Sequence, residues 1–357
     1  MKNSNVLLAI VCCVLIGGCC PCLVDQTPGS DGFDFVFCWG SVKDEETARA
    51  YAEAGVTDVF ASGEKAVAAA KKFGMRPYCG FFPNGPRNQV LRADEQQHFD
   101  YINAKDLKGK LPKEELARKT TERQVASRCQ FGGEPVVAMD TCPEMIACFL
   151  SDTNCVAAKA QMKKTLEANP LAEGIAFDYI GYVNFHSCEC DGCKARLAAS
   201  GKDADTFFRE ALVEYVNTLV DYAKSLRPGI KVAIHLYPAF RPDPLYGKAL
   251  KADYIQETVA WYFQWPDEKI SDYTRKILSA PHLPGARSVP FVGLNAEQSR
   301  ALAYKSPERL EAELKLILAA GGRQLAVCNG GDMLKPGYRE VFRKYRASRD
   351  NHSVPAE

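Results

Sequence analysis

The sequence predicts an α/β fold: a (β/α)8 TIM barrel with an insertion after its third strand and a cysteine-rich loop after its fourth. Short β-rich runs alternate with amphipathic helical runs along the chain, which is typical of a parallel sheet with crossover helices. Eight such units can be counted, the number that closes a TIM barrel. An open doubly wound sheet is the alternative, but the G-x-G-x-x-G motif usual in such sheets does not follow the first strand.

The expected strands are short apolar runs bounded by turn residues. They lie at residues 33–39, 56–60, 75–81, 174–178, 231–237, within 254–263, 289–294 and 324–328. Residues 83–133 are polar and charged, and we interpret them as an insertion in the loop after the third strand.

The expected helices carry apolar residues on one face and have recognisable ends. They lie at residues 43–54, 64–73, 155–168, 206–226, 307–320 and 338–347. Ser306 followed by Pro307 is typical of a helix start, an N-cap followed by proline in the first turn. Gly55, Gly74 and Gly321 are typical of helix ends.

The chain begins with a targeting segment. Lys2 precedes an apolar run, residues 6–16, which has the length of a signal-peptide core and is too short to span a bilayer. Residues 15–19, Leu-Ile-Gly-Gly-Cys, resemble a bacterial lipobox, in which the cysteine is lipidated. We therefore expect a signal peptide at 1–18, a membrane anchor at Cys19 and a tether at 19–32. An ordinary cleaved signal peptide, giving a secreted protein, is the alternative.

The rest of the chain has the composition of a globular protein. We expect a single barrel domain at 33–348 and a flexible tail at 349–357. The formal net charge is +1, from 45 basic and 44 acidic residues, so there is no electrostatic case for nucleic acid as a partner.

Asp178 is the most informative residue of the chain. It ends the apolar run Gly-Ile-Ala-Phe of residues 174–177. A carboxylate buried there without a partner would be costly, and TIM-barrel active sites lie at the carboxyl ends of the strands. The pattern therefore favours a carboxylate facing a polar cleft. A structural aspartate that accepts hydrogen bonds from loop amides is the alternative.

Residues 177–183, Phe-Asp-Tyr-Ile-Gly-Tyr-Val, resemble the F-D-Y-I-R-[FY]-P signature of a family of bacterial TIM-barrel glycosyl hydrolases. Residues 253–255, Asp-Tyr-Ile, leading to Trp261 and Tyr262, are similar to the strand 6 pattern of that family. The resemblance covers about residues 170–330. It departs at Gly181, where the family has arginine, and at Val183, where it has proline. It implies an enzyme that cleaves glycosidic bonds in a poly- or oligosaccharide, and we expect no cofactor to be required. Export is expected from the targeting segment.

Such enzymes commonly use two carboxylates, about 5–5.5 Å apart when retaining and about 6.5–9.5 Å apart when inverting. The resemblance assigns Asp178 as nucleophile or ionic stabiliser. As its partner we favour Glu297, just after the seventh strand, and then Asp140; Glu257 and Asp332 are further candidates. A solvated loop charge or a helix cap is the alternative for each.

Aromatic side chains gather near the expected strand ends. Flat rings with a polar edge suit the faces of sugars. The candidates for substrate binding are Trp39, Phe81, Tyr182, His235, Tyr237, Trp261 and Tyr262. Barrel core is the alternative for about half of them, and a satisfied core histidine is the alternative for His235.

Fifteen cysteines is a high count. His186, Cys188, Cys190 and Cys193 offer four ligands in eight residues, compatible with a structural zinc site. The rival is a set of disulfides with Cys129, Cys142, Cys148 and Cys155. Export favours disulfides, which we favour slightly, whereas the tight spacing favours a metal because one short loop cannot form many unstrained bridges.

Three functions are compatible with the sequence. The first is a glycoside hydrolase, and the second is a catalytically inactive barrel that binds carbohydrate, which the loss of arginine at Gly181 favours. The third is a different enzyme on the same scaffold, because a fold alone does not fix a function.

Overall fold

The computed structural model describes residues 32–83, 90, 148–178, 180, 187–236, 246–261, 265–298 and 304–346. These residues belong to one compact unit, Asp31–Glu357. The lipobox, the C-terminal tail and nearly all of the expected insertion lie outside the described residues.

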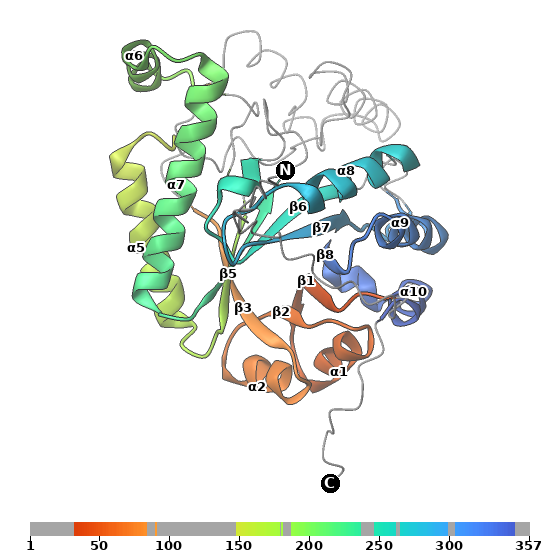
Figure 1. Ribbon diagram of the computed structural model, residues 1–357. Helices are drawn as coiled ribbons and strands as arrows, with labels where there is room; N and C mark the ends of the chain where they lie inside the picture. Colours follow the sequence, from red (N-terminus) through yellow and green to blue (C-terminus); the bar gives the residue numbers. More distant parts are fainter. Residues whose placement is uncertain are drawn as a thin grey trace, which may run out of the picture. The chain divides into compact units, whose positions relative to one another are not determined.

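Eight parallel strands close into a barrel in the order β1 to β8, with β8 paired back to β1 (Figure 1). The strands are β1 (Phe35–Val42), β2 (Asp58–Ala61), β3 (Arg76–Phe81), β4 (Gly174–Phe177), β5 (Lys231–Leu236), β6 (Tyr254–Ala260), β7 (Arg287–Gly293) and β8 (Gln324–Cys328). Each overlaps an expected strand, so the predicted TIM barrel is confirmed.

Helices flank the barrel on its outer side (Figure 1). They are α1 (Glu45–Glu53), α2 (Glu64–Lys72), α5 (Asp152–Ala168), α6 (Asp191–Ser200), α7 (Ala204–Leu226), α8 (Asp267–Ser279), α9 (Pro307–Ala319) and α10 (Tyr338–Lys344), with the 3-10 turns η2 (Tyr246–Ala249) and η3 (Gly330–Leu334). Neither α6 nor α8 was predicted from the sequence. No helix in the described part of the chain is both long and apolar enough to cross a membrane.

The ends of the helices follow from local chemistry. Ser306 caps α9, because its side chain accepts a hydrogen bond from the amide of Arg309 and Pro307 occupies the first turn, as predicted. Asp203 caps α7 in the same way through the amide of Thr206. These caps satisfy amides that would otherwise lack partners at the helix start.

The amino-terminal end of the barrel is closed by a polar layer over aromatic rings. Arg76 lies 3.1 Å from a carboxylate oxygen of Asp58 and donates to the hydroxyl of Tyr254 at 2.9 Å. Burial raises the pKa of the Asp58 carboxyl, although the Arg76 guanidinium acts against that effect. Above this layer the ring of Phe37 packs edge-on against Tyr78 at 4.7 Å between centroids. The site must therefore open at the opposite, carboxyl-terminal end.

Candidate functional site

Asp178 directly follows β4 and lies beside His235 of β5. The strands pair with Phe177 opposite Ile234, which brings the next residue of each strand together. Asp178 Oδ1 is 3.1 Å from His235 Nδ1, and the exposed fractions of the two side chains are 13% and 3%. The carboxylate thus borders the barrel interior and remains partly open to solvent.

The hydrogen bonds of His235 fix the number of protons at this pair. A hydroxyl donates one proton, and Thr258 donates its proton to the carbonyl of Leu236 at 2.9 Å. His235 Nε2, 3.2 Å from Thr258 Oγ1, must therefore be the donor to that oxygen. The bond between Nδ1 and Asp178 then needs a second proton, because a neutral imidazole carries only one N–H. The pair is consequently either an imidazolium with a carboxylate or a neutral histidine with a protonated aspartate.

Aromatic rings surround the His235 imidazole. Phe291 stacks on it at 3.9 Å between centroids and Trp261 at 5.6 Å, while Trp39 meets it edge-on at 5.9 Å. Trp261 is buried and Trp39 is partly exposed. Trp39 is also oriented by its indole N–H, which donates to Gln256 at 2.5 Å. Of these rings, Trp39 is therefore the one that a ligand could reach.

Several predicted site residues are not brought into this group. Phe81 is fully buried and packs edge-on against Phe177 at 5.0 Å. Phe81 and Phe177 are paired neighbours in the sheet and alternate with the inward-facing positions, so Phe81 is a core residue on the helix side. Asp140, Tyr182, His186, Tyr237 and Tyr262 lie outside the described residues.

The candidate partner carboxylates occupy different surroundings. Glu297 is exposed on the loop after β7, where its amide donates to Asn295 Oδ1 at 2.9 Å. This loop leaves the same end of the barrel as Asp178. Asp332 accepts from the amide of Ala296 at 2.9 Å and pairs with Lys335 at 2.7 Å, so it fastens that loop.

Glu257 faces the helix side of the sheet rather than the barrel interior. Its neighbour in β6, Gln256, contacts Trp39 inside the barrel, and successive side chains of a strand alternate between faces. Glu257 accepts instead from Ser288 at 2.7 Å and lies 3.7 Å from His282 Nε2. It is therefore not a partner for Asp178.

Sequence reasoning missed Thr258, Gln256 and Phe291. The even-numbered positions of β6 share one face, and this alternation could have identified Gln256 and Thr258. It could not be applied because β6 was placed only within residues 254–263, without a defined start.

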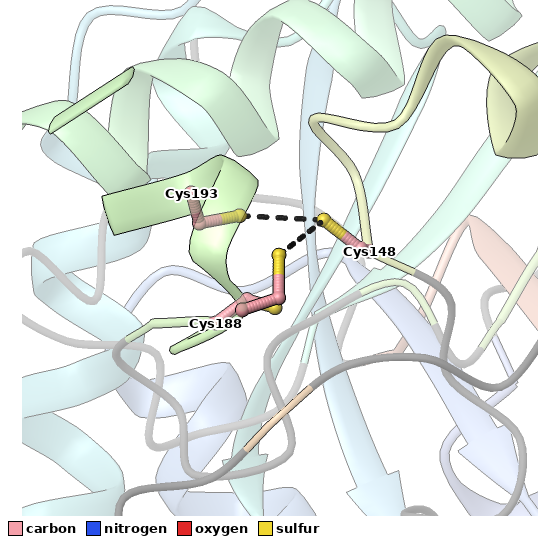
Figure 2. A group of neighbouring side chains, drawn as sticks. Cys148, Cys188 and Cys193 are labelled. Atoms are coloured by element: carbon pink, nitrogen blue, oxygen red, sulfur yellow. Dashed lines mark hydrogen bonds between the residues drawn. The ribbon is translucent and has the colours of Figure 1, made fainter. Parts of the chain in front are cut away.

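A cluster of four cysteines lies near the start of α6. The sulfur atoms of Cys148, Cys188, Cys190 and Cys193 all lie within 4.8 Å of one another. Cys148 Sγ is 3.3 Å from Cys193 Sγ and 3.9 Å from Cys190 Sγ. Figure 2 shows the side chain of Cys148 pointing toward those of Cys188 and Cys193. In the described part of the chain these cysteines are thiols rather than disulfides, and four such sulfurs could hold a zinc ion.

The described cluster contains the predicted ligands Cys188, Cys190 and Cys193 together with Cys148, which was predicted only as a disulfide partner. His186, the other predicted ligand, lies outside the described residues. The amide of Val90 donates to Cys188 Sγ at 3.4 Å, and Val90 accepts from the amide of Glu189 at 2.7 Å. The pKa of the Cys188 thiol is lowered because the thiols of Cys148 and Cys193 hydrogen-bond to it.

Comparison with known proteins identifies a fold but no sequence family. No family model matches the chain, and no curated protein matches it. Among solved structures, the glycoside hydrolase domain of PgaB (BpsB) from Bordetella bronchiseptica is similar with a TM-score of 0.55 and 10% identity, covering 89% of this chain and 100% of that one. The spore cortex-lytic enzyme SleL from Bacillus megaterium QM B1551 follows with a TM-score of 0.47 and 8% identity, covering 90% of this chain and 75% of that one. At these identities the likeness shows the TIM-barrel fold alone.

Proposed function

We propose that this protein is a glycoside hydrolase acting on a poly- or oligosaccharide at the carboxyl-terminal end of the barrel. The observation that carries the proposal is the Asp178 carboxylate, partly exposed beyond β4 and hydrogen-bonded to His235. The resemblance of residues 177–183 to a glycosyl hydrolase signature supports the same site. The similarity in fold to a glycoside hydrolase domain is consistent with it.

Asp178 is the residue that acts on the anomeric carbon. A carboxylate there either attacks that carbon or stabilises the positive charge that develops on it. Of the two protonation states of the pair, the imidazolium with a carboxylate leaves Asp178 charged for this task. His235 then orients the carboxylate and balances its charge, with Thr258 holding the far side of the ring.

The second carboxylate must donate a proton to the leaving-group oxygen. Glu297 is our first candidate, because it is exposed on a loop at the same end of the barrel. Asp140 is the second candidate. Trp39 is the proposed sugar platform, because its ring is partly exposed beside His235 and an aromatic face offers apolar area to a pyranose.

The test combines a panel of polysaccharides with two matched variants. Asp178→Asn keeps the size of the side chain and removes its charge, so we expect turnover to fall by about 10³-fold or more while the melting temperature is retained. Asp253→Asn is the control, because Asp253 has a similar exposed fraction of 15% but binds Lys231 and the amide of Val232 at the other end of the barrel. It should melt earlier and keep its rate per folded molecule.

An inactive carbohydrate-binding barrel is the second candidate function. Gly181 favours it, because the resembling family carries arginine at that position. Binding of a polysaccharide by the wild-type protein without release of any product, across the whole panel, would replace the hydrolase proposal by this one. Wild-type turnover on any member of the panel would exclude it.

A further inference from the structure

The four-cysteine cluster has the geometry of a closed metal site. Tetrahedral zinc bound to sulfur at about 2.3 Å places neighbouring sulfurs about 3.8 Å apart. The distances from Cys148 Sγ to Cys193 Sγ and to Cys190 Sγ, 3.3 and 3.9 Å, lie on either side of that value. All four sulfurs converge within 4.8 Å. We infer that Cys148, Cys188, Cys190 and Cys193 bind one structural zinc ion.

Two disulfides would arrange the same sulfurs differently. A disulfide brings two sulfurs to about 2.05 Å and leaves each pair independent of the other. Here Cys148 Sγ lies 3.3 Å from Cys193 Sγ and 3.9 Å from Cys190 Sγ, so it approaches two different cysteines. Four sulfurs that converge on one point are what a tetrahedral ion needs and what a pair of disulfides does not require.

The surroundings suit a site that is negatively charged. Four thiolates around Zn²⁺ leave a net charge of −2, which needs nearby donors. The amide of Val90 donates to Cys188 Sγ at 3.4 Å. Cys190 is the N-cap of α6 and Cys193 lies in its first turn, so the positive end of the helix dipole faces the cluster. Soft thiolate ligands select zinc over magnesium or calcium.

The ligands come from separate parts of the chain that the ion would join. Cys148 precedes α5, where its carbonyl accepts from Asn154 at 3.0 Å. Cys188 and Cys190 end the segment that follows Asp178. Val90, from the segment after β3, is held through Cys188 and Glu189. Zinc would therefore tie three connections of the barrel together, a role that does not depend on the proposed hydrolase activity.

Elemental analysis of the full mature chain, purified without reductant or chelator, tests the site directly. We expect about one zinc per chain and, after denaturation with a chelator, four cluster cysteines that react as thiols. Cys148→Ser should lose the zinc and melt at a lower temperature. Cys155→Ser is the matched control: Cys155 lies nearby in α5 but outside the cluster, and this variant should keep the metal.

The zinc content and thiol reactivity of the wild-type protein distinguish a zinc site from disulfides. These measurements do not depend on whether a variant folds. Absence of zinc together with four unreactive cysteines would identify disulfides and overturn the proposal. Iron in place of zinc would overturn the identity of the ion. Full zinc content in Cys148→Ser would overturn the ligand set, whereas retention of zinc in Cys190→His, which offers an imidazole ligand, would support it.

Discussion

The proposed function rests on two side chains at the ends of neighbouring strands, Asp178 and His235. Asp178 could be selected from the sequence because a carboxylate after an apolar strand needs a polar partner. The identity of that partner depends on the register of β4 against β5, which only the closed barrel fixes. The proton between Asp178 and His235 is inferred in turn from the hydrogen bonds of Thr258. The sequence did not single out this threonine.

His235 is a positioning residue in this scheme. His235→Asn removes the imidazolium beside Asp178, so kcat should fall by about 10²-fold while KM changes little. The split between kcat and KM is the readout, because a merely structural residue would change the amount of folded protein and not kcat per folded molecule. A lower melting temperature with an unchanged kcat per folded molecule would show that His235 is merely structural.

His282 and Glu257 form a second acid–base pair, outside the barrel interior. His282 Nδ1 donates to the carbonyl of Ala280 at 2.7 Å, and Nε2 lies 3.7 Å from the Glu257 carboxylate. That carboxylate raises the pKa of His282 above the ordinary value of a histidine. A histidine pKa raised by folding adds stability that is fully present below the unfolded-state pKa and is lost as the pH rises through the folded-state pKa.

We therefore expect the melting temperature of the wild-type protein to fall as the pH is raised from 6 toward 8. His282→Gln cannot be charged and should remove this part of the pH dependence. Thermal melts at several pH values measure it. Identical pH dependence in the wild-type and variant proteins would contradict an ion pair between His282 and Glu257.

At the scale of elements, strands and caps were predictable and connections were not. Apolar periodicity identified the eight strands, and Ser306 with Pro307 identified the start of α9. The connection before α9 contains Lys305, which is fully buried and pairs with Glu313 at 2.5 Å. A lysine in a loop is normally exposed, so no sequence pattern indicates this pair. α6 was not predicted either, because the cysteines at its start were interpreted as part of a cysteine-rich loop.

Packing inside the barrel depends on a glycine at the start of β4. A Cβ atom at Gly174 would lie 2.1 Å from the ring of Tyr78, which is fully buried against Phe37. Gly174→Ala should therefore lower the free energy of unfolding by about 1–3 kcal/mol, as overpacked cores do. The midpoint of urea unfolding measures this effect.

Gly192 in α6 is the matched control, because nothing lies within 4 Å of a Cβ atom built there. Gly192→Ala should be neutral or slightly stabilising, since alanine favours a helix over glycine. Equal midpoints for the two variants would mean that the Tyr78 ring can move aside.

For the whole molecule, the sequence predicted the barrel better than the candidate site. Period-two patterns and turn residues specify strands locally, and eight of them close in sequence order. Which side chains of a strand face the barrel interior depends on the assembled barrel. For this reason Phe81 was predicted to lie in the cleft, although it packs on Phe177. Cys148 lies 40 positions before Cys188, so only folding reveals that the two belong to one cluster.

We propose that a lipid anchor on Cys19 forms the start of the mature chain and holds the barrel at a membrane. Acyl chains bind a membrane by about 0.8 kcal/mol for each buried CH₂ group. Cys19→Ser should therefore move the protein from the detergent phase to the aqueous phase on phase separation, or block its processing. Cys22→Ser, in the same tether but outside the lipobox, should remain with the detergent. If Cys19→Ser and Cys22→Ser partition alike, Cys19 is not the anchor, and an ordinary cleaved signal peptide accounts for residues 1–18.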